Sequence, residues 1–144
     1  MISSTPTVLI VDDDPQVCES LSLMVRGAGL NARTYLSAEE FLDGCHELPA
    51  APHCMVLDVR MPGISGLGLQ QLLAAQRRSM PIIMISGCAD IPTAVQAMSA
   101  GAIDFIEKPF SRRTVLNRIQ EAIDKDASLR RHTAQHAELH GRLE

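Results

Sequence analysis

The sequence predicts an α/β protein in which a parallel sheet is wrapped by helices. Short apolar runs alternate with longer amphipathic segments five times along the 144 residues, which is the pattern of repeated strand and helix units. Two of the runs, at about 53–58 and 81–86, hardly alternate between apolar and polar residues. Because near-continuous apolar character indicates burial on both faces, we expect these two runs to be central strands.

The first half of the chain supplies two strands and the helix between them. Strands are expected at about 7–12 and 31–36. The helix begins at Pro15, a residue that suits the first helical turn, and ends near Gly29. Its apolar face is predicted to consist of Val17, Leu21, Met24, Val25 and Ala28.

A second helix begins with residues 37–40, Ser-Ala-Glu-Glu. This is a capping box, in which the Ser37 hydroxyl and the Glu40 carboxylate satisfy each other's free backbone donors. The helix is expected to turn Phe41 and Leu42 inward.

The second half of the chain continues the same alternation. After the strand at 53–58, a loop over 59–66 that contains proline and glycine leads to a leucine-rich helix. The strand at 81–86 is followed by a helix at about 92–100, and the last strand is expected at 103–107.

A fifth helix is expected to begin at Ser111 or Arg112 and to end the globular part of the chain. Beyond it, residues 125–144 contain no proline, and their apolar stripe is too sparse to form a core. We therefore expect one domain over 1–124 and a helical linker or extension over 125–144. The inward face of the fifth helix is predicted to carry Val115, Leu116, Ile119 and Ile123.

The composition excludes several classes of function. A net charge of -4 provides no basic surface for nucleic acid, so the chain should not bind DNA well by itself. The sequence contains neither a signal-peptide pattern nor an apolar run long enough to span a membrane, so we expect a cytoplasmic protein. The apolar content of 46% is sufficient for a hydrophobic core.

Polar residues stand where four of the apolar runs end. They are the aspartates at 12–14, then Asp58, Ser86 and Lys108. If the runs are neighbouring parallel strands, these groups meet at one edge of the sheet, where open α/β sheets bind ligands. Clustered carboxylates are suited to a hard divalent cation, and a lysine supplies a point charge for phosphate. The sequence thus predicts a phosphate-handling Mg²⁺ site.

Asp58 is the best candidate for a nucleophile, because it stands alone at the end of a central strand. A carboxylate can accept a phosphoryl group when a metal neutralises the phosphoryl oxygens. The ordinary alternative is a turn or helix-capping aspartate, and Asp14 is expected to cap the helix that begins at Pro15. Lys108 is one of two lysines in the chain, which argues against an incidental position on the surface.

The ordered set of motifs resembles the receiver domain of two-component response regulators. The set consists of Asp12-Asp13, Asp58, Met61-Pro62-Gly63, Ser86 and Lys108-Pro109-Phe110, and the resemblance covers about residues 6–124. It implies a doubly wound, flavodoxin-like sheet of five parallel strands in the order 2-1-3-4-5, flanked by five helices.

By this resemblance, Asp58 accepts a phosphoryl group from a sensor histidine kinase. The resemblance also implies that Mg²⁺ is bound by Asp13, Asp58 and the main-chain carbonyl of Arg60, with Asp12 acting mostly through water. The domain would then be a signalling phosphoacceptor rather than a metabolic enzyme, with Mg²⁺-dependent self-phosphorylation and autodephosphorylation.

The resemblance assigns Ser86 and Lys108 to the phosphoryl oxygens, and Phe105 to an aromatic switch position. Phosphorylation would draw Ser86 and Lys108 towards Asp58 and allow Phe105 to turn inward. The signal would be read on the face formed by the fourth helix, the fifth strand and the fifth helix, and we expect that face to form a phosphorylation-dependent homodimer.

The stretches 37–42 and 90–110 look most like the nitrogen-fixation type of regulator, whose output is a LuxR-class helix-turn-helix. DNA binding and control of transcription would then require a C-terminal domain that is absent from these 144 residues. A stand-alone regulator and an output through an enhancer-binding ATPase are the alternatives.

Two functions of other classes compete with this interpretation. A haloacid-dehalogenase-type phosphatase would use Asp12 as nucleophile and Asp14 as acid and base, but proline at 15 and the lack of a second acidic pair after Lys108 argue against it. A flavodoxin-like electron carrier would need a phosphate loop after the first strand and aromatic residues around a flavin. The chain has one tyrosine and no tryptophan.

Overall fold

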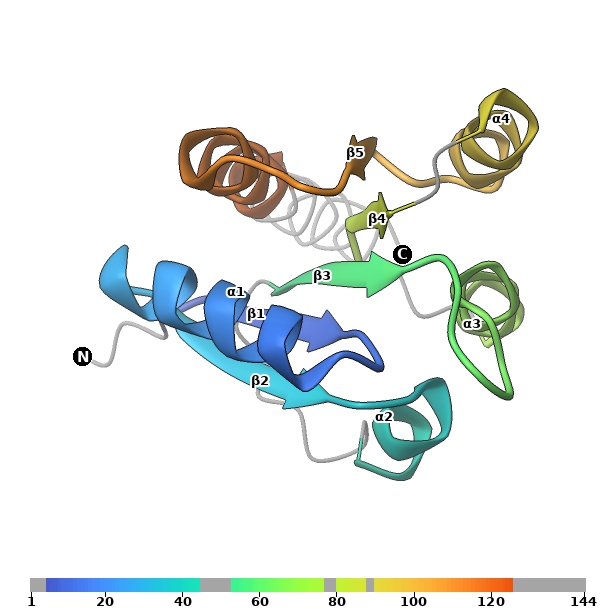
Figure 1. The fold of residues 1–144 in the computed structure, drawn as a ribbon, viewed down its shortest axis with the longest axis horizontal. Helices are drawn as coiled ribbons and strands as arrows, with labels where there is room; N and C mark the ends of the chain where they lie inside the picture. The colour runs from blue at the N-terminus through green and yellow to red at the C-terminus, as the bar shows by residue number, and fades with distance from the viewer. Residues whose placement is uncertain (1–4, 45–52, 77–79, 88–89, 126–144) are drawn as a thin grey trace, which may run out of the picture.

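The computed structural model describes residues 5–44, 53–76, 80–87 and 90–125, and it contains a five-stranded parallel sheet (Figure 1). The strand order is β2-β1-β3-β4-β5, as the resemblance to receiver domains implied. The two runs that were expected to be central, β3 and β4, lie inside the sheet together with β1. The strands are β1 Thr7–Val11, β2 Asn31–Tyr35, β3 His53–Asp58, β4 Ile82–Ser86 and β5 Asp104–Glu107.

Helices cover both faces of the sheet (Figure 1). α1 and the helical segment 112–125 lie on one face, and α2, α3 and α4 lie on the other. The predicted helix starts agree with the structure to within a residue or two. The predicted extension beyond 125 lies outside the described residues. The remaining bounds are α1 Pro15–Gly27, α2 Ala38–Gly44, α3 Gly66–Ala75 and α4 Ile91–Ser99.

Side-chain oxygens cap the starts of α1 to α4 and of the 112–125 helix, where the Ser111 hydroxyl oxygen accepts the amide of Thr114 at 3.1 Å. The Asp14 carboxylate accepts the amide of Gln16 at 2.9 Å and caps α1, as predicted. In the capping box, the Ser37 hydroxyl oxygen accepts the amide of Glu40 at 3.0 Å, which confirms the serine half of that motif. Ser65 and Asp90 cap α3 and α4 in the same way.

The buried face of α1 differs in part from the prediction. Leu21 and Val25 are buried, and so is Cys18, which the apolar pattern did not include. Ala28 was wrongly placed on this face, because it is exposed at the C-cap, where the chain leaves the helix. On α2, Phe41 is fully buried and meets the Tyr35 ring edge-on at a centroid distance of 5.2 Å.

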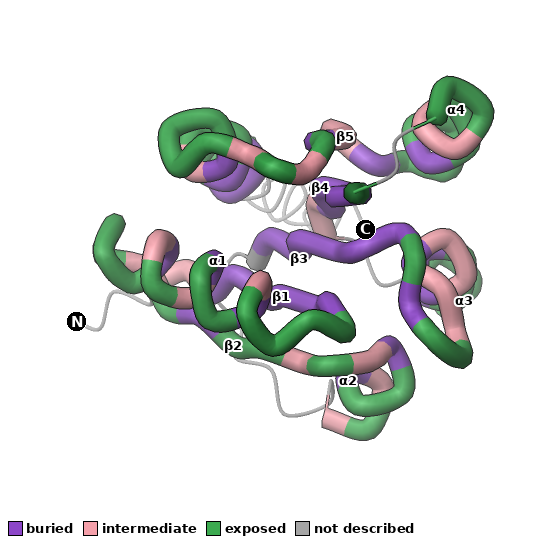
Figure 2. The backbone as a smooth tube through the Cα atoms, in the orientation of Figure 1, coloured by how far each residue is buried: buried purple, intermediate pink, exposed green. Residues whose placement is uncertain are grey.

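The sheet separates two hydrophobic clusters. Alternate residues of the strands face one or the other, so Val8 and Ile10 belong to the cluster under α1, and Leu9 and Val11 belong to the cluster under α2 and α3. Figure 2 shows β1 and residues 54–58 of β3 as buried. These strands therefore form a rigid base for whatever stands at their carboxyl ends.

The strand register brings the ends of β1, β3, β4 and β5 to one edge. Val11 pairs with Leu57, so the residue after each lies at the same level of the sheet. Asp58 pairs with Ile85, and Ser86 pairs with Glu107. In the described ranges, no helix is long and apolar enough to cross a membrane.

Candidate functional site

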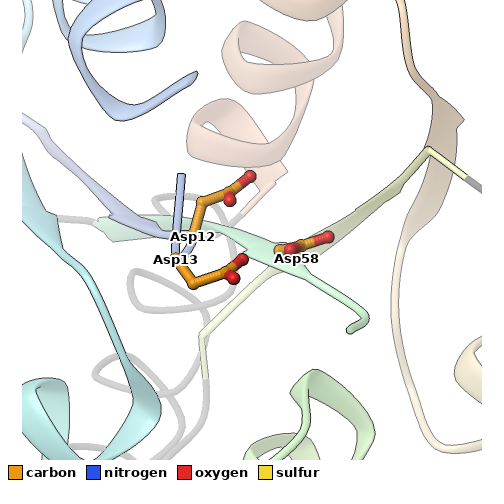
Figure 3. Close-up of side chains that lie close together, drawn as sticks. All are labelled: Asp12, Asp13 and Asp58. Carbon is orange, nitrogen blue, oxygen red and sulfur yellow. The ribbon is translucent and has the colours of Figure 1, made fainter. Parts of the chain in front are cut away.

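Three carboxylates meet at the carboxyl ends of β1 and β3 (Figure 3). One oxygen from each of Asp12, Asp13 and Asp58 lies within 4.8 Å of the others. Asp12 is fully buried and Asp58 is 5% exposed, whereas Asp13 is exposed to solvent. The sequence therefore predicted correctly that these side chains converge, and the cluster is open to solvent on the side of Asp13.

The backbone around Asp12 holds its side chain in place. Its amide donates to the carbonyl of Tyr35 at 3.1 Å, which continues the pairing of β1 with β2 by one residue. Its Oδ1 accepts the amide of Asp14 at 2.9 Å. The turn into α1 therefore orients Asp12, while its Oδ2 remains available for other groups.

Lys108 reaches both buried carboxylates from the end of β5. Its Nζ lies 2.9 Å from Asp12 Oδ2 and 3.5 Å from Asp58 Oδ1. Its amide donates to the carbonyl of Ser86 at 2.8 Å, so β4 fixes the point where the side chain begins. The peptide bond from Lys108 to Pro109 is cis. One cation thus joins two carboxylates that would otherwise repel each other.

The electrostatics of the site oppose the ionisation of Asp58. Burial and the charge of Asp12 raise the pKa of Asp58 to about 6, and Lys108 only partly offsets this. Burial alone would lower the pKa of Lys108, but its hydrogen bond to Asp12 and the charges of Asp12 and Asp58 raise it above its usual value. Added positive charge at this edge would therefore favour the ionised carboxylate.

The donor set fits a hard divalent cation. Carboxylate oxygens are the ligands that Mg²⁺ and Ca²⁺ prefer, and Mg²⁺ commonly keeps several waters beside one or two carboxylates. The exposed Asp13 leaves a side on which waters or a phosphoryl group can complete the coordination. Asp12, Asp13 and Asp58 would hold the ion.

The other predicted site residues take distinct positions. Ser86 is the last residue of β4 and is 1% exposed, one residue beyond the strand partner of Asp58. Phe105 is half-buried on β5, opposite Met84, and packs against the cluster under α2, α3 and α4. The Arg60 side chain is 65% exposed and pairs with Asp90 at 3.6 Å, so any part in metal binding falls to its main chain.

Gly66 contributes to the site in a way that the sequence did not reveal. Its amide donates to the carbonyl of Val59 at 2.9 Å and closes the loop between β3 and α3. A Cβ atom at Gly66 would overlap the main-chain carbonyl of Asp58, whose carbon would be 2.9 Å away. The available signal was the glycine at the start of α3, a residue type that permits a close backbone approach.

The sequence of the chain is similar to those of proteins of a known family. Residues 8–120 match the family described as the response regulator receiver domain. The chain belongs to this family. The receiver is 44% identical over 132 residues to the response regulator protein TmoT of Ectopseudomonas mendocina, and covers 59% of TmoT with 92% of its own length.

Other relatives of the receiver are regulators of the same kind. It is 38% identical to the transcriptional regulatory protein FixJ of Azorhizobium caulinodans, with 94% of this chain and 64% of FixJ covered. The solved structure of the response regulator StyR superposes with a TM-score of 0.86 at 40% identity, over 96% of this chain and 69% of that one. The receiver thus spans about three-fifths of the length of these curated relatives.

The receiver geometry also argues against the phosphatase alternative. Asp14, its candidate acid and base, is engaged as the N-cap of α1. Asp12, its candidate nucleophile, is fully buried and ion-paired with Lys108. Asp58 is 5% exposed and lies farther from the Lys108 ammonium, at 3.5 Å against 2.9 Å for Asp12, so it is the better placed carboxylate.

Proposed function

We propose that Asp58 is the phosphoacceptor of this receiver and that its donor is a phosphohistidine of a sensor histidine kinase. The observation that carries the proposal is the grouping of Asp12, Asp13 and Asp58, two of which, Asp12 and Asp58, pair with the ammonium of Lys108. The domain signals rather than metabolises, because its product is a modified form of itself.

The transfer is a displacement at phosphorus. One Oδ of Asp58 forms a bond to phosphorus while the bond from phosphorus to the imidazole nitrogen breaks, and that nitrogen keeps the electron pair. Lys108 and the hydroxyl of Ser86 contact the phosphoryl oxygens. In the return to the resting state, water attacks the same phosphorus, the bond from phosphorus to Asp58 Oδ breaks, and inorganic phosphate leaves while Asp58 regains its carboxylate.

Mg²⁺ is the proposed cofactor, held by Asp12, Asp13, Asp58 and the main-chain carbonyl of Arg60. The bound ion would neutralise the charge on the phosphoryl oxygens. The chain's own residues do the rest, since β1 and β3 hold the carboxylates in position and Lys108 supplies a positive charge from the end of β5. Self-phosphorylation by small donors and autodephosphorylation both follow from this arrangement.

The receiver is proposed to be the 1–124 part of a cytoplasmic transcription regulator, with 125–144 as a helical linker to an output domain. Support comes from relatives whose names describe transcriptional regulation and whose lengths exceed this chain. DNA would be bound by a C-terminal helix-turn-helix. Phosphorylation is proposed to move Ser86 and Phe105 and to favour a homodimer through α4, β5 and the 112–125 helix.

Phosphorylation with a small donor tests the assignment of Asp58. Wild type, Asp58→Asn and the control Asp14→Asn are incubated with acetyl phosphate and Mg²⁺, and the modified residue is mapped by mass spectrometry. We expect one phosphoryl group on Asp58 in wild type and Asp14→Asn, and none in Asp58→Asn, because an amide is a poor nucleophile. Equal labelling of Asp58→Asn on another aspartate would refute the assignment.

A further inference from the structure

The loop between β3 and α3 begins at the proposed phosphoacceptor. It runs from Asp58 to Gly66 and includes Arg60, whose carbonyl is a proposed metal ligand. Its base is closed by the bond from the Gly66 amide to the Val59 carbonyl, 2.9 Å long. The base is therefore fixed, and Met61 and Ile64 pack their side chains into the cluster under α2, α3 and α4, which leaves the backbone of the loop tip to be held by a polar contact.

Glu39 supplies a contact to the far side of this loop. It lies in the first turn of α2, and its Oε2 accepts the amide of Ile64 at 3.4 Å. Figure 1 shows the loop, drawn in green, passing beside α2. This hydrogen bond joins the β3–α3 loop to α2, through residues that are 25 positions apart in sequence.

The backbone at Gly63 makes room for the Glu39 carboxylate. Gly63 has φ of 76°, in the left-handed region that favours glycine. A Cβ atom at this position would overlap Glu39 Oε2 and lie 3.3 Å from its Cδ. Glu39 is exposed, so hydrophobic packing does not account for this close approach. The Glu39 carboxylate thus occupies the space that a side chain at position 63 would need.

We propose that Glu39 is a positioning residue that holds the β3–α3 loop so that the Arg60 carbonyl faces the metal site. The inference rests on the proposed Mg²⁺ binding at Asp12, Asp13 and Asp58. Glu39 does not touch the metal or the phosphoryl group. It acts through Gly63 and Ile64, and its contribution is to keep the loop in the binding conformation before the ion arrives.

Three variants separate the effect of the hydrogen bond between Glu39 and Ile64 from the effect of the negative charge of Glu39. Glu39→Ala removes both, and Glu39→Gln removes the charge but keeps an oxygen that can accept from Ile64. Glu40→Gln removes the same charge one residue away and retains the capping box. Each is titrated with MgCl₂ in its unphosphorylated form by calorimetry, and its melting temperature is measured without Mg²⁺.

We expect Glu39→Ala to raise the Mg²⁺ dissociation constant about 3- to 10-fold, the effect of losing one hydrogen bond that favours the bound conformation. Glu39→Gln and Glu40→Gln should stay within about 2-fold of wild type, as electrostatics at the protein surface are weak. Without Mg²⁺, Glu39→Ala should melt close to wild type.

Three results would overturn the proposal. An equal loss of affinity in all three variants would mean that only the charge matters. A lower melting temperature with unchanged Mg²⁺ affinity in Glu39→Ala would mean that the contact only stabilises the fold. No Mg²⁺ binding by wild type would remove the proposed metal site as well, which distinguishes that failure from the other two.

Gly63→Ala tests the same contact from the loop side. Its Cβ must displace the Glu39 carboxylate, so Mg²⁺ affinity should fall as in Glu39→Ala. In the double variant the space is free, but an alanine at a φ of 76° is still strained. We therefore expect its Mg²⁺ affinity to lie below that of Glu39→Ala and above the value that the product of the two single effects gives. Fully multiplicative effects would show that Gly63 and Glu39 act independently and would contradict the proposal.

Discussion

Asp58→Asn should stabilise the metal-free protein, by an amount that depends on pH. The pKa of Asp58 is raised from 3.8 to about 6, first by burial and then by the charge of Asp12. The folded state therefore binds the proton more tightly than the unfolded state does. Wild type is expected to lose stability as pH rises from about 4 through 6, because the folded protein must give up that proton.

The size of the effect follows from the shift in pKa. Each pKa unit corresponds to about 1.4 kcal/mol, so the ionised Asp58 costs on the order of 2–3 kcal/mol above pH 7. An asparagine carries no charge at any pH and avoids this cost. The gain in Asp58→Asn should appear as a rise in melting temperature of about 6–12 °C at pH 7.5 and should vanish near pH 4.

Thermal melts at several pH values, all in EDTA, measure this gain. Asp14→Asn is the matched control, because it makes the same change at an exposed N-cap where asparagine caps as well as aspartate, and it should shift the free energy of unfolding by less than about 0.5 kcal/mol. If Asp58→Asn gains nothing at pH 7.5, or gains as much at pH 4 as at pH 7.5, the crowding of charge at this site is wrongly described.

Three further outcomes are expected. Asp13→Asn should also stabilise the metal-free protein and should lose the rise in melting temperature that millimolar Mg²⁺ gives wild type, so a full Mg²⁺ response would exclude Asp13 as a ligand. Gly66→Ala should lower the free energy of unfolding by about 2–4 kcal/mol in urea titrations, because its Cβ overlaps the Asp58 backbone, and a loss below 1 kcal/mol would contradict that close approach. Ser86→Ala should still be phosphorylated but dimerise less than wild type when beryllofluoride is added. Equal sedimentation of the two proteins would remove Ser86 from the switch, and a lack of dimer in both would remove the dimer proposal.

Much of the site could be predicted from the sequence because strand ends are easy to recognise. A run of apolar residues that stops at an aspartate marks the carboxyl end of a strand, and parallel strands bring such ends together. The convergence of Asp12 and Asp58 follows from this rule alone. Helix starts could be predicted equally well, because Asp14 and Ser37 form their capping hydrogen bonds with residues two or three positions ahead.

Contacts that depend on long-range geometry could not be predicted. Lys108 was expected at the same edge of the sheet as Asp12 and Asp58, but the pattern does not reveal that one ammonium would contact both carboxylates. The approach of Glu39 to Gly63 depends on how α2 docks beside a loop of another unit. The apolar periodicity of α1 wrongly placed Ala28 on the buried face. A periodic pattern does not show where a helix ends, and Ala28 is the C-cap residue.

The division of the hydrophobic core by the sheet has a consequence for evolution and for protein engineering. Neighbouring residues on one strand, such as Ile83 and Met84, belong to different clusters and meet different helices. A change in packing under α1 and the 112–125 helix is separated by a whole layer of backbone from the packing under α2, α3 and α4. The two clusters can therefore accumulate substitutions at different rates. A chimaeric receiver could take the helices of one face from one parent and those of the other face from a second parent, with the strands common to both.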